Sequence, residues 1–293
     1  MKTIVTHNST YHADDVFAVA TLLLIYPGSK IIRTRDASLI DSADLVVDVG
    51  FKYDPGIDRF DHHQPGGAGV RENGIQYASF GLVWKKYGEK LAQGKEEAEL
   101  IEHFLVEPLD AHDNGMPIAE YKYENLREYT LVDFLYSYLP KSGAFKEELD
   151  QTFLKVVDIA KELILREIVR AKEDVKSGKE VEAIYKSIED KRIILMDHEY
   201  NWFRVLMKFP EPTYVVYPRN DGVSWGVRCV PASSKVYGLF RKKLPEPWGG
   251  KTGEELQKIS GVNEALFVHR GLFMASAKTK EGAMELAKKA LDA

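Results

Sequence analysis

Histidine and aspartate side chains gather in three short segments of this 293-residue chain. Five of the eight histidines lie there, and each segment also carries aspartate: residues 7–15, 61–63 and 110–115. A further carboxylate, Asp48, directly follows the apolar run 45–47, which is typical of a buried parallel strand. Side chains that follow such strands lie at the edge of the sheet where open α/β proteins keep their chemistry. The pattern predicts one site in which imidazole and carboxylate groups converge.

Convergence of these side chains would require bound cations. Carboxylates in contact raise one another's pKa, and a metal ion removes this penalty. Imidazole and carboxylate ligands together suit Mn, Zn, Fe or Co better than Ca, which prefers oxygen alone, and Mg favours fewer histidines. The only cysteine, Cys229, lies in an apolar run far along the chain, so a thiolate zinc site is excluded. The candidate ligands are His7, His12, Asp14, Asp48, His62 and Asp110.

Asp14 and Asp15 precede an apolar, helix-like run at residues 16–25. Either aspartate could accept hydrogen bonds from the first turn of that helix. We predict that Asp15 caps the helix and that Asp14 faces the metal. A single aspartate at a turn or strand end has a structural role about as often as a chemical one. Only the coincidence of several aspartates with histidines indicates a site.

The motifs resemble those of the DHH phosphoesterase superfamily, which includes RecJ-type exonucleases and manganese-dependent inorganic pyrophosphatases. Within it, residues 6–15, 61–64 and 110–115 are similar to the Myg family of metal-dependent hydrolases, described as 3′ to 5′ RNA exonucleases in eukaryotes. Further segments look like the carboxyl-terminal landmarks of the same family, so the resemblance covers most of the chain. These landmarks are residues 241–250, 260–262 and 267–269.

The resemblance implies two divalent metal ions, with manganese favoured and Mg, Co, Fe and Zn as alternatives. His12 stands where most superfamily members have aspartate, which changes a ligand type without removing the site, and Asp15 stands where Myg proteins usually have glutamate. Two ions roughly 3.5–4 Å apart can stabilise both the attacking and the leaving oxygen. By the family pattern Asp48 bridges them: one ion would be held by His7, His12 and Asp48, the other by Asp14, Asp48, His62 and Asp110.

Other residues of the motifs are expected to act on the substrate. His63 would donate to a phosphoryl oxygen as a catalytic residue, and Asp61 would orient an imidazole by accepting its N–H. His112 is a candidate substrate contact, whereas Asp113 is interpreted as a turn residue in a loop. His269 looks like a carboxyl-terminal family residue that meets substrate, although a histidine that ends an apolar strand is equally well explained by a structural hydrogen bond.

The net charge of −5 argues against a surface that binds duplex nucleic acid nonspecifically. Contacts to a nucleic acid would then come from local basic patches, and the run Arg241, Lys242 and Lys243 is the best candidate. Three consecutive charges are also typical of a solvated loop. Aromatic residues near this run favour base stacking, although most aromatics in strands are core residues: Tyr217, Trp225, Tyr237, Phe240 and Trp248.

The chain is expected to be an α/β protein of two domains joined by a long helix. Residues 1–140 would form a DHH-like catalytic, metal-binding domain with a mainly parallel sheet. Residues 141–180 would form the helical connection, with an amphipathic pattern over 145–175. Residues 181–293 would form a smaller α/β domain with a mostly antiparallel sheet, which binds substrate and resembles the DHH-associated domain. Helices are also expected over 77–87, 96–106 and 280–292.

These features predict a metal-dependent phosphodiester hydrolase, a 3′ to 5′ exonuclease on single-stranded RNA or short oligonucleotides. The alternatives are a small-molecule phosphohydrolase, acting on pyrophosphate or a dinucleotide, and a non-enzymatic metal-binding protein. The latter is disfavoured because structural metal sites tend to be closed and rich in thiolate. No apolar run approaches the roughly 20 residues of a membrane span, and one cysteine is consistent with the reducing cytoplasm, where we expect the protein. The sequence leaves the oligomeric state open.

Overall fold

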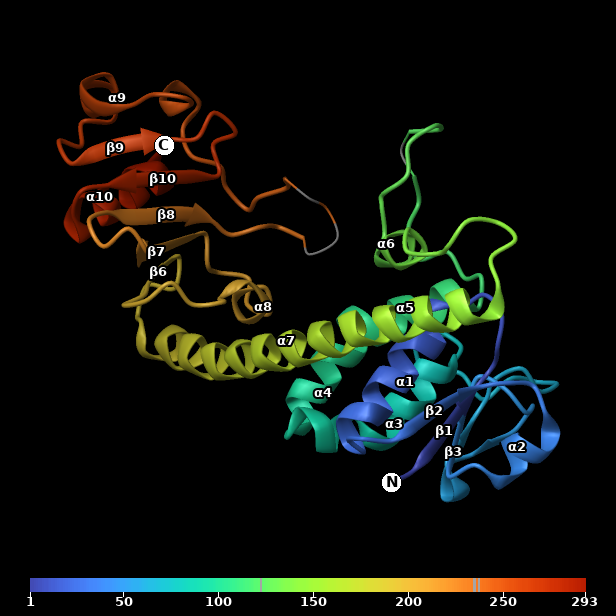
Figure 1. Cartoon of the computed structure of the whole chain (residues 1–293). Coiled ribbons are helices and arrows are strands. Elements are labelled where there is room, and N and C mark those ends of the chain that lie inside the picture. Colours follow the sequence, from blue (N-terminus) through green and yellow to red (C-terminus); the bar gives the residue numbers. More distant parts are fainter. Residues whose placement is uncertain (122, 234–235, 237) are drawn as a thin grey trace. The chain divides into compact units, whose positions relative to one another are not determined.

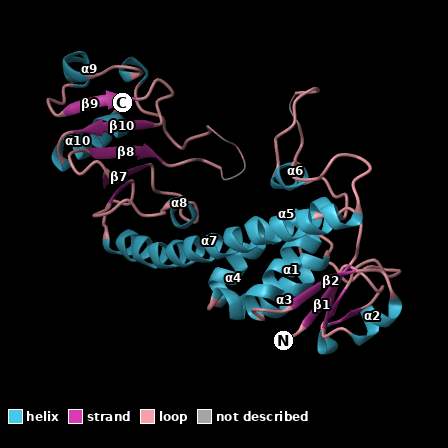
Figure 2. Cartoon of the chain, in the orientation of Figure 1, coloured by secondary structure: helices cyan, strands magenta, loops and turns pink. Residues whose placement is uncertain are grey.

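The structure, a computed structural model, describes residues 1–293 except Lys122, Ser234, Lys235 and Tyr237. The chain divides into two compact units, Met1–Lys172 and Glu173–Ala293 (Figure 1). Each unit contains a five-stranded sheet, the first mainly parallel and the second mainly antiparallel (Figure 2). The long helix α7, Lys146–Ser187, contributes residues to both units. The predicted mixed α/β fold class is therefore confirmed.

The sheet of the first unit has the strand order β2-β1-β3-β5-β4. Four of these strands run parallel, and β4 pairs antiparallel with β5 at one edge. The residues of β3 are apolar and buried, as expected for a central strand covered on both faces. The strand bounds are β1 Thr3–Thr6, β2 Lys30–Arg33, β3 Leu45–Val47, β4 Tyr53–Asp54 and β5 Arg59–Phe60, with a 3₁₀ turn at Pro55–Ile57.

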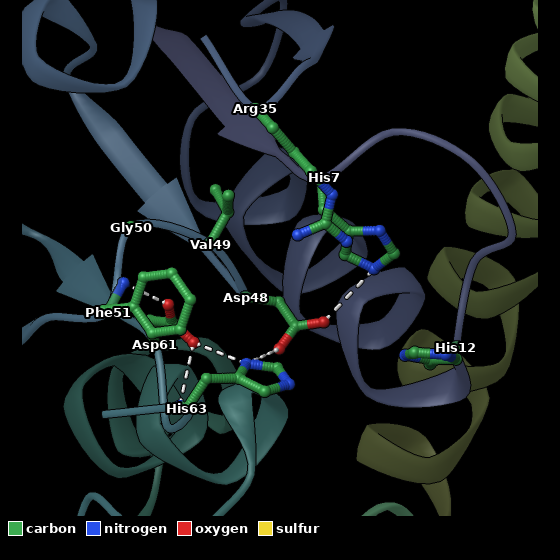
Figure 3. A pocket seen from close by; sticks show the side chains of 9 residues that line it. All are labelled: His7, His12, Arg35, Asp48, Val49, Gly50, Phe51, Asp61 and His63. Carbon is green, nitrogen blue, oxygen red and sulfur yellow. Dashed lines mark hydrogen bonds and ion pairs between the residues drawn. The ribbon is translucent and has the colours of Figure 1, made fainter. Parts of the chain in front are cut away.

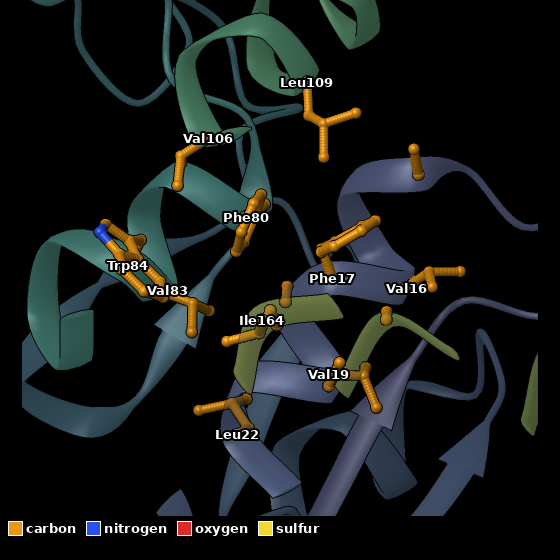
Figure 4. Close-up of a cluster of buried hydrophobic side chains, with 14 of the residues drawn as sticks. Val16, Phe17, Val19, Leu22, Phe80, Val83, Trp84, Val106, Leu109 and Ile164 are labelled. Atoms are coloured by element: carbon orange, nitrogen blue, oxygen red, sulfur yellow. The ribbon is translucent and has the colours of Figure 1, made fainter. Parts of the chain in front are cut away.

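The core of the first unit is formed by helices packed beside this sheet. The rings of Phe17 and Phe80, on α1 and α3, have centroids 5.3 Å apart, and Ile164 of α7 belongs to the same cluster (Figure 4). Because α1 is apolar nearly all round, it can be buried against several neighbours. The helix bounds are α1 Ala13–Ile25, α2 Ala37–Ser42, α3 Ser79–Ala92, α4 Lys95–Ile101, α5 Glu107–Asp113 and α6 Leu131–Tyr136.

One predicted helix is longer in the structure, and this changes the site. The helix expected over 96–106 continues to Asp113 through a π-helical segment at Glu102–Val106. Pro108 does not end it, and this proline lies directly after the π-helical segment, in the first turn of α5. The prediction that Asp113 lies in a loop is therefore wrong, because Asp113 is the last residue of α5. Since residues three apart share a helix face, Asp110 and Asp113 lie on the same side of α5.

Helix α7 also exceeds its predicted end at residue 175 and continues to Ser187. No proline occurs between residues 176 and 187, and the single glycine there, Gly178, lowers helix propensity without ending the helix. Its first half packs into the first unit, where Asp150 accepts a hydrogen bond of 2.8 Å from the guanidinium of Arg33. Sequence patterns predict that a helix exists more reliably than where it ends.

The second unit has the strand order β6-β7-β8-β10-β9, in which only the β6–β7 pair is parallel. Helix α10, Lys280–Asp292, has the predicted bounds and buries one face against this sheet. Among the described residues, no helix combines the length and apolarity that a membrane crossing requires. The remaining bounds are β6 Ile193–Leu195, α8 Phe203–Leu206, β7 Tyr214–Pro218, β8 Trp225–Cys229, a 3₁₀ turn at Glu246–Trp248, α9 Gly253–Ser260, β9 Ala265–Val268 and β10 Met274–Ala277.

Candidate metal centre

The ends of three adjacent parallel strands place the central residues of the site. His7 follows β1, Asp48 follows β3, and the Asp61–His63 triplet follows β5. The carboxyl ends of parallel strands meet at one edge of a sheet, so these side chains lie together (Figure 3). Asp48 has a φ of +57°, in the left-handed region that residues other than glycine rarely adopt. Such strained backbone occurs preferentially at functional sites.

The carboxylate of Asp48 faces a different histidine with each oxygen. Its Oδ2 lies 3.3 Å from Nε2 of His7, and its Oδ1 lies 3.3 Å from Nε2 of His62. Ser79, the first residue of α3, donates its hydroxyl to Oδ1 of Asp48 at 3.0 Å. Asp48 is buried, as are His7 and Ser79. The geometry is that of a carboxylate placed between two imidazole-containing half-sites.

Further carboxylates surround these two histidines. Oδ2 of Asp15 lies 3.1 Å from Nε2 of His7. Oδ2 of Asp113 lies 3.1 Å and Oδ2 of Asp14 lies 3.9 Å from Nε2 of His62. Asp15 does take part in capping α1, although His12 and not Asp15 is the N-cap residue: Oδ1 of Asp15, at the third helical position, accepts the backbone N–H of His12 at 3.0 Å. Asp15 therefore caps α1 with one oxygen and contacts His7 with the other.

Three overlapping groups of side chains in this region can hold an ion, with ligand atoms within 4.8 Å of one another. Ligands that share one ion at about 2.0–2.2 Å lie at most roughly 4.4 Å apart, so small side-chain rotations would suffice to close each group. Asp48 belongs to two groups, and His12 also belongs to two. The groups are His7 with His12 and Asp48, Asp48 with His62 and His63, and His12 with Asp14 and Asp113.

Buried ligand atoms that lack a hydrogen bond support a metal site. Among the described residues, eight buried side-chain nitrogen or oxygen atoms have no hydrogen-bond partner, and five belong to this cluster. Buried polar atoms are nearly always paired, and an ion is a partner that accounts for such exceptions. The residues present therefore fit a cation. The five atoms are Nε2 of His7, Oδ1 of Asp14, Oδ2 of Asp15, Oδ2 of Asp48 and Nε2 of His62.

Electrostatics in the metal-free cluster favour charged imidazoles. Burial lowers the pKa of His7, but the carboxylates of Asp15 and Asp48 outweigh burial and raise this pKa to about 10. In the same way, Asp113 and Asp48 outweigh burial at His62 and raise its pKa to about 10. Two imidazolium groups thus supply positive charge among four aspartates. A metal ion would take over this charge and release the imidazole protons.

The pKa values of Asp48 and Asp14 are shifted in opposite directions. Burial tends to raise the pKa of Asp48, yet the close contacts and positive charges of His62 and His7 prevail and hold this pKa far below its usual range. At Asp14, burial together with the charges of Asp48 and Asp113 raises the pKa well above its usual range. Asp48 is therefore ionised under all ordinary conditions, whereas ionised Asp14 requires a neighbouring cation.

Asp61 organises the open side of the site. Its Oδ1 lies 2.8 Å from Nδ1 of His63 and accepts the backbone N–H of the same residue at 3.1 Å. Its Oδ2 accepts the backbone N–H of Phe51 at 2.5 Å. The hydrogen bond that His63 donates to Asp61 raises the pKa of His63, whose side chain is about half exposed. Because Asp61 occupies Nδ1, Nε2 is the ring nitrogen available to a ligand.

Asp110 lies apart from the three ligand groups. Its Oδ2 contacts the guanidinium of Arg71 at 2.6 Å, and its Oδ1 accepts the backbone N–H of Gly81 at 3.0 Å. Burial raises the pKa of Asp110 to about 7, although Arg71 opposes this shift. A Cβ atom on Gly81 would lie 1.8 Å from Oδ2 of Asp110, so only glycine leaves room for the Asp110 carboxylate at this position. Three residues further along α5, Asp113 lies beside His62.

The predicted substrate contacts His112 and His269 belong to different units. His112 is exposed on α5, about 100° around the helix from Asp113. His269, in the second unit, lies with its ring 4.3 Å from that of Phe273, and its Nδ1 accepts the backbone N–H of Gly271 at 2.9 Å. This backbone contact accords with the structural alternative for His269 and leaves its Nε2 available.

Two of the three residues in the basic run 241–243 form hydrogen bonds with backbone carbonyls of the second unit. Arg241 donates to the carbonyl of Pro212 at 2.7 Å, and Lys242 donates to the carbonyl of Leu291 at 2.7 Å. Lys243 is exposed.

Of the aromatic residues expected to stack on bases, Tyr217 and Trp248 are buried and Trp225 is half-buried. The ring of Phe240 stacks on that of Phe273, and Tyr237 lies outside the described residues.

Sequence patterns missed four residues around the site. Ser79 binds Asp48 through its hydroxyl and Asp14 through its backbone N–H at 3.3 Å. Arg71 holds Asp110. Arg35 and Phe51 line the cavity over Asp48. This cavity is lined by His7, His12, Arg35, Asp48, Val49, Gly50, Phe51, Asp61 and His63 (Figure 3).

Two curated proteins resemble this chain over nearly its whole length. MYG1 protein C694.04c of Schizosaccharomyces pombe is 33% identical over 320 residues, which cover 99% of this chain and 97% of that protein. MYG1 exonuclease of Homo sapiens is 30% identical over 329 residues, which cover 98% of this chain and 85% of that protein. RecJ from Thermus thermophilus, solved in complex with Mg²⁺, matches all of this chain and 50% of its own at 14% identity, with a TM-score of only 0.29.

A family model covers almost the entire chain. It is MYG1_exonuc, described as Uncharacterised protein family (UPF0160), and it matches residues 3–291. Because this match and the relatives at 30% identity or more span both units, the chain belongs to the MYG1 family, as its motifs predict.

Proposed function

We propose that this protein is a metal-dependent phosphodiester hydrolase, acting as a 3′ to 5′ exonuclease on single-stranded RNA or short oligonucleotides. The observation that carries the proposal is the position of Asp48, whose two oxygens face His7 and His62 separately at 3.3 Å. A carboxylate so placed suits two ions held close together, the arrangement used to hydrolyse phosphate esters. The relative from Homo sapiens is named an exonuclease, which supports a nucleic-acid substrate.

One ligand group and the close contacts of His62 suggest how two ions would be shared. His7, His12 and Asp48 would hold one ion, and Asp48, His62 and Asp113 would hold the other, with Asp14 beside it. Asp113 thus replaces Asp110 in the proposed ligand set. The mixture of imidazole and carboxylate favours Mn, with Co, Fe, Zn and Mg as alternatives.

When bound, the two ions would polarise the phosphoryl group and lower the pKa of an attacking water towards neutrality. The chain itself supplies position and hydrogen bonds. Ser79 fixes Asp48 and Asp14 by donating to both. His63, held through Nδ1 by Asp61, would donate from Nε2 to a phosphoryl oxygen as charge develops there. A cytoplasmic location accords with the single, buried cysteine.

A substrate panel tests this function. The protein is stripped of metal, reloaded with Mn²⁺ and given RNA, single-stranded DNA, a dinucleotide and pyrophosphate. RNA carrying its label at the 5′ end should give a ladder that shortens stepwise from the 3′ end. RNA labelled at the 3′ end should release labelled mononucleotide at once. The same protein without metal is the matched control and should cleave nothing.

Other outcomes of the panel would contradict the proposal. Release of labelled mononucleotide from the 5′ end first would reverse the polarity. Cleavage of pyrophosphate or the dinucleotide alone would identify a small-molecule phosphohydrolase. If metal binds but no phosphoester is cleaved, the non-enzymatic alternative stands.

A further inference from the structure

The cavity over Asp48 has two wall residues that metal binding does not use, Arg35 and Phe51. Arg35 comes from the segment after β2, and Phe51 comes from the loop after β3. Figure 3 shows the Arg35 side chain extending towards His7, while the Phe51 ring lies beside Asp61 and His63. A guanidinium and an aromatic ring therefore share one cavity with the candidate metal ligands.

The backbone of Phe51 is strained where it places the ring at the cavity wall. The residue is 69% exposed, and its φ of +53° is in the left-handed region. A bulky residue rarely adopts this conformation, and Asp48 and Gly50 in the same loop also have positive φ. The backbone N–H of Phe51 is fixed by Asp61, and the nearby Val49 is buried. The loop thus presents an aromatic ring to solvent in a defined place beside the ligands.

Arg35 differs from its neighbour Arg33 in having its charge available. Arg33 is buried, and its guanidinium binds Asp150 and the carbonyl of Ser9. Arg35 is exposed, and no hydrogen bond or ion pair joins its guanidinium to any residue that the structure describes. A guanidinium can bind two phosphate oxygens at once, which a lysine cannot reproduce.

We propose that this cavity binds the terminal nucleotide of the strand, with the nucleobase stacked on Phe51 and a phosphate oxygen held by Arg35. This inference rests on the proposed function. The ring of Phe51 suits the nucleobase and the guanidinium of Arg35 suits a phosphate oxygen, neither of which takes part in the reaction. The candidate metal ligands around Asp48 would face the phosphodiester bond that is cleaved. Because every nucleobase offers a flat face, stacking on Phe51 would accept all four bases. Asp61 then positions both the ring, through Phe51, and the donor His63.

Binding of AMP and of ribose 5-phosphate separates the two contacts. Both are titrated into Mn²⁺-loaded protein by calorimetry. Phe51→Asn removes the ring with a residue that tolerates positive φ. It should weaken AMP binding by about 5- to 100-fold and leave ribose 5-phosphate binding unchanged. Arg35→Ala should weaken both ligands by about 10-fold or more, because both contain the phosphate.

Conservative and distant variants serve as controls. Phe51→Tyr should retain AMP affinity because it keeps a stacking face. Phe145→Asn, which removes a comparably exposed phenylalanine outside the cavity, should change neither affinity. Bound manganese is counted in every variant and should remain at the wild-type level, because neither Arg35 nor Phe51 is a proposed ligand. Melting temperatures verify that each variant is folded.

Equal affinity of wild type and Phe51→Asn for AMP would overturn the subsite, as would equal losses on both ligands. Cleavage of labelled RNA by the wild type is measured in parallel. If the wild type cleaves RNA but the variants bind AMP as the wild type does, the subsite is refuted and the proposed function is not. If the wild type neither cleaves RNA nor binds AMP, the proposed function and the subsite fall together.

Discussion

Oδ2 of Asp113 lies 3.1 Å from Nε2 of His62, while Asp110, three residues earlier on the same helix, is engaged by Arg71. Two aspartates that look interchangeable in the sequence thus have different partners. The difference arises because α5 continues through both residues and presents them on one face at successive turns. Asp113 reaches the cluster at the strand ends, and Asp110 meets α3 at Gly81.

Substitution separates these roles. Asp113→Asn should lower affinity for Mn²⁺ by roughly 10-fold or more and leave the melting temperature of the metal-free protein almost unchanged. Asp110→Asn should destabilise the fold by about 1–3 kcal/mol, because it removes the charge that pairs with Arg71, which then keeps only Glu102 as an ion-pair partner. Metal titration and urea unfolding measure the two effects. The reverse result, with metal lost only in Asp110→Asn, would restore Asp110 as the ligand.

Asp48→Asn should abolish turnover and reduce bound metal while the fold is retained. An amide removes the charge of the group that faces both His7 and His62. Metal content is counted by elemental analysis, and turnover is measured on labelled RNA. Asp158→Asn, an exposed aspartate of α7, is the matched control and should behave as wild type. Near-normal activity with two bound ions in Asp48→Asn would refute the bridging role.

His63→Ala should keep both ions and lose about 10²–10³-fold in kcat, the usual effect of removing one preorganised donor. The side chain of His63 is half exposed, and Asp61 directs it, so its loss should not disturb the buried ligands. Steady-state kinetics and metal counting are done on the same sample. Because His63 also lies within reach of Asp48 and His62, loss of an ion in this variant would make His63 a ligand.

Metal binding should release protons at neutral pH. In the metal-free protein the pKa values of His7 and His62 are about 10, so both imidazoles carry a proton that an incoming ion must displace. Apparent affinity for Mn²⁺ should therefore rise between pH 6 and pH 9. Titration in weak buffer with a pH indicator measures the protons released. An affinity independent of pH over this range would contradict the charged imidazoles.

The raised pKa values of His7 and His62 also make the stability of the metal-free fold depend on pH. A histidine whose pKa rises on folding stabilises the fold fully below its unfolded value near 6.5, and this contribution is lost as the pH rises through about 10. Metal-free protein should lose melting temperature over that window. Metal-loaded protein should lose less, because its imidazoles are already neutral.

Much of this site could be predicted from the sequence because parallel strands gather their carboxyl ends without regard to finer detail. The position of Asp48 after an apolar run, together with the clustering of histidine and aspartate in three short segments, was enough to predict that these side chains meet. The choice between Asp110 and Asp113 was not accessible in this way. It depends on whether α5 is a helix or a loop, and on Arg71, whose partner lies 39 residues away in the chain.

Arg35 and Phe51 were missed for a related reason. Neither belongs to a motif, and an isolated arginine or phenylalanine carries no sequence signal for chemistry. Their place depends on strand order, since β2 and β3 lie on opposite sides of β1. It also depends on the left-handed conformation of Phe51, which no residue preference predicts.

The basic run of the second unit should separate into structural and exposed residues. Arg241→Ala should destabilise the protein by about 1–3 kcal/mol, because Arg241 donates to the carbonyl of Pro212 at 2.7 Å. Lys243→Ala should leave stability unchanged, since Lys243 is exposed. If Lys243 contacts a phosphate of the strand, its loss should lower the slope of log affinity against log salt concentration by about 0.7. Urea unfolding and oligonucleotide binding at several salt concentrations test both residues. An unchanged slope would remove Lys243 from the substrate path, and an unchanged stability of Arg241→Ala would show that its guanidinium is not needed by the fold.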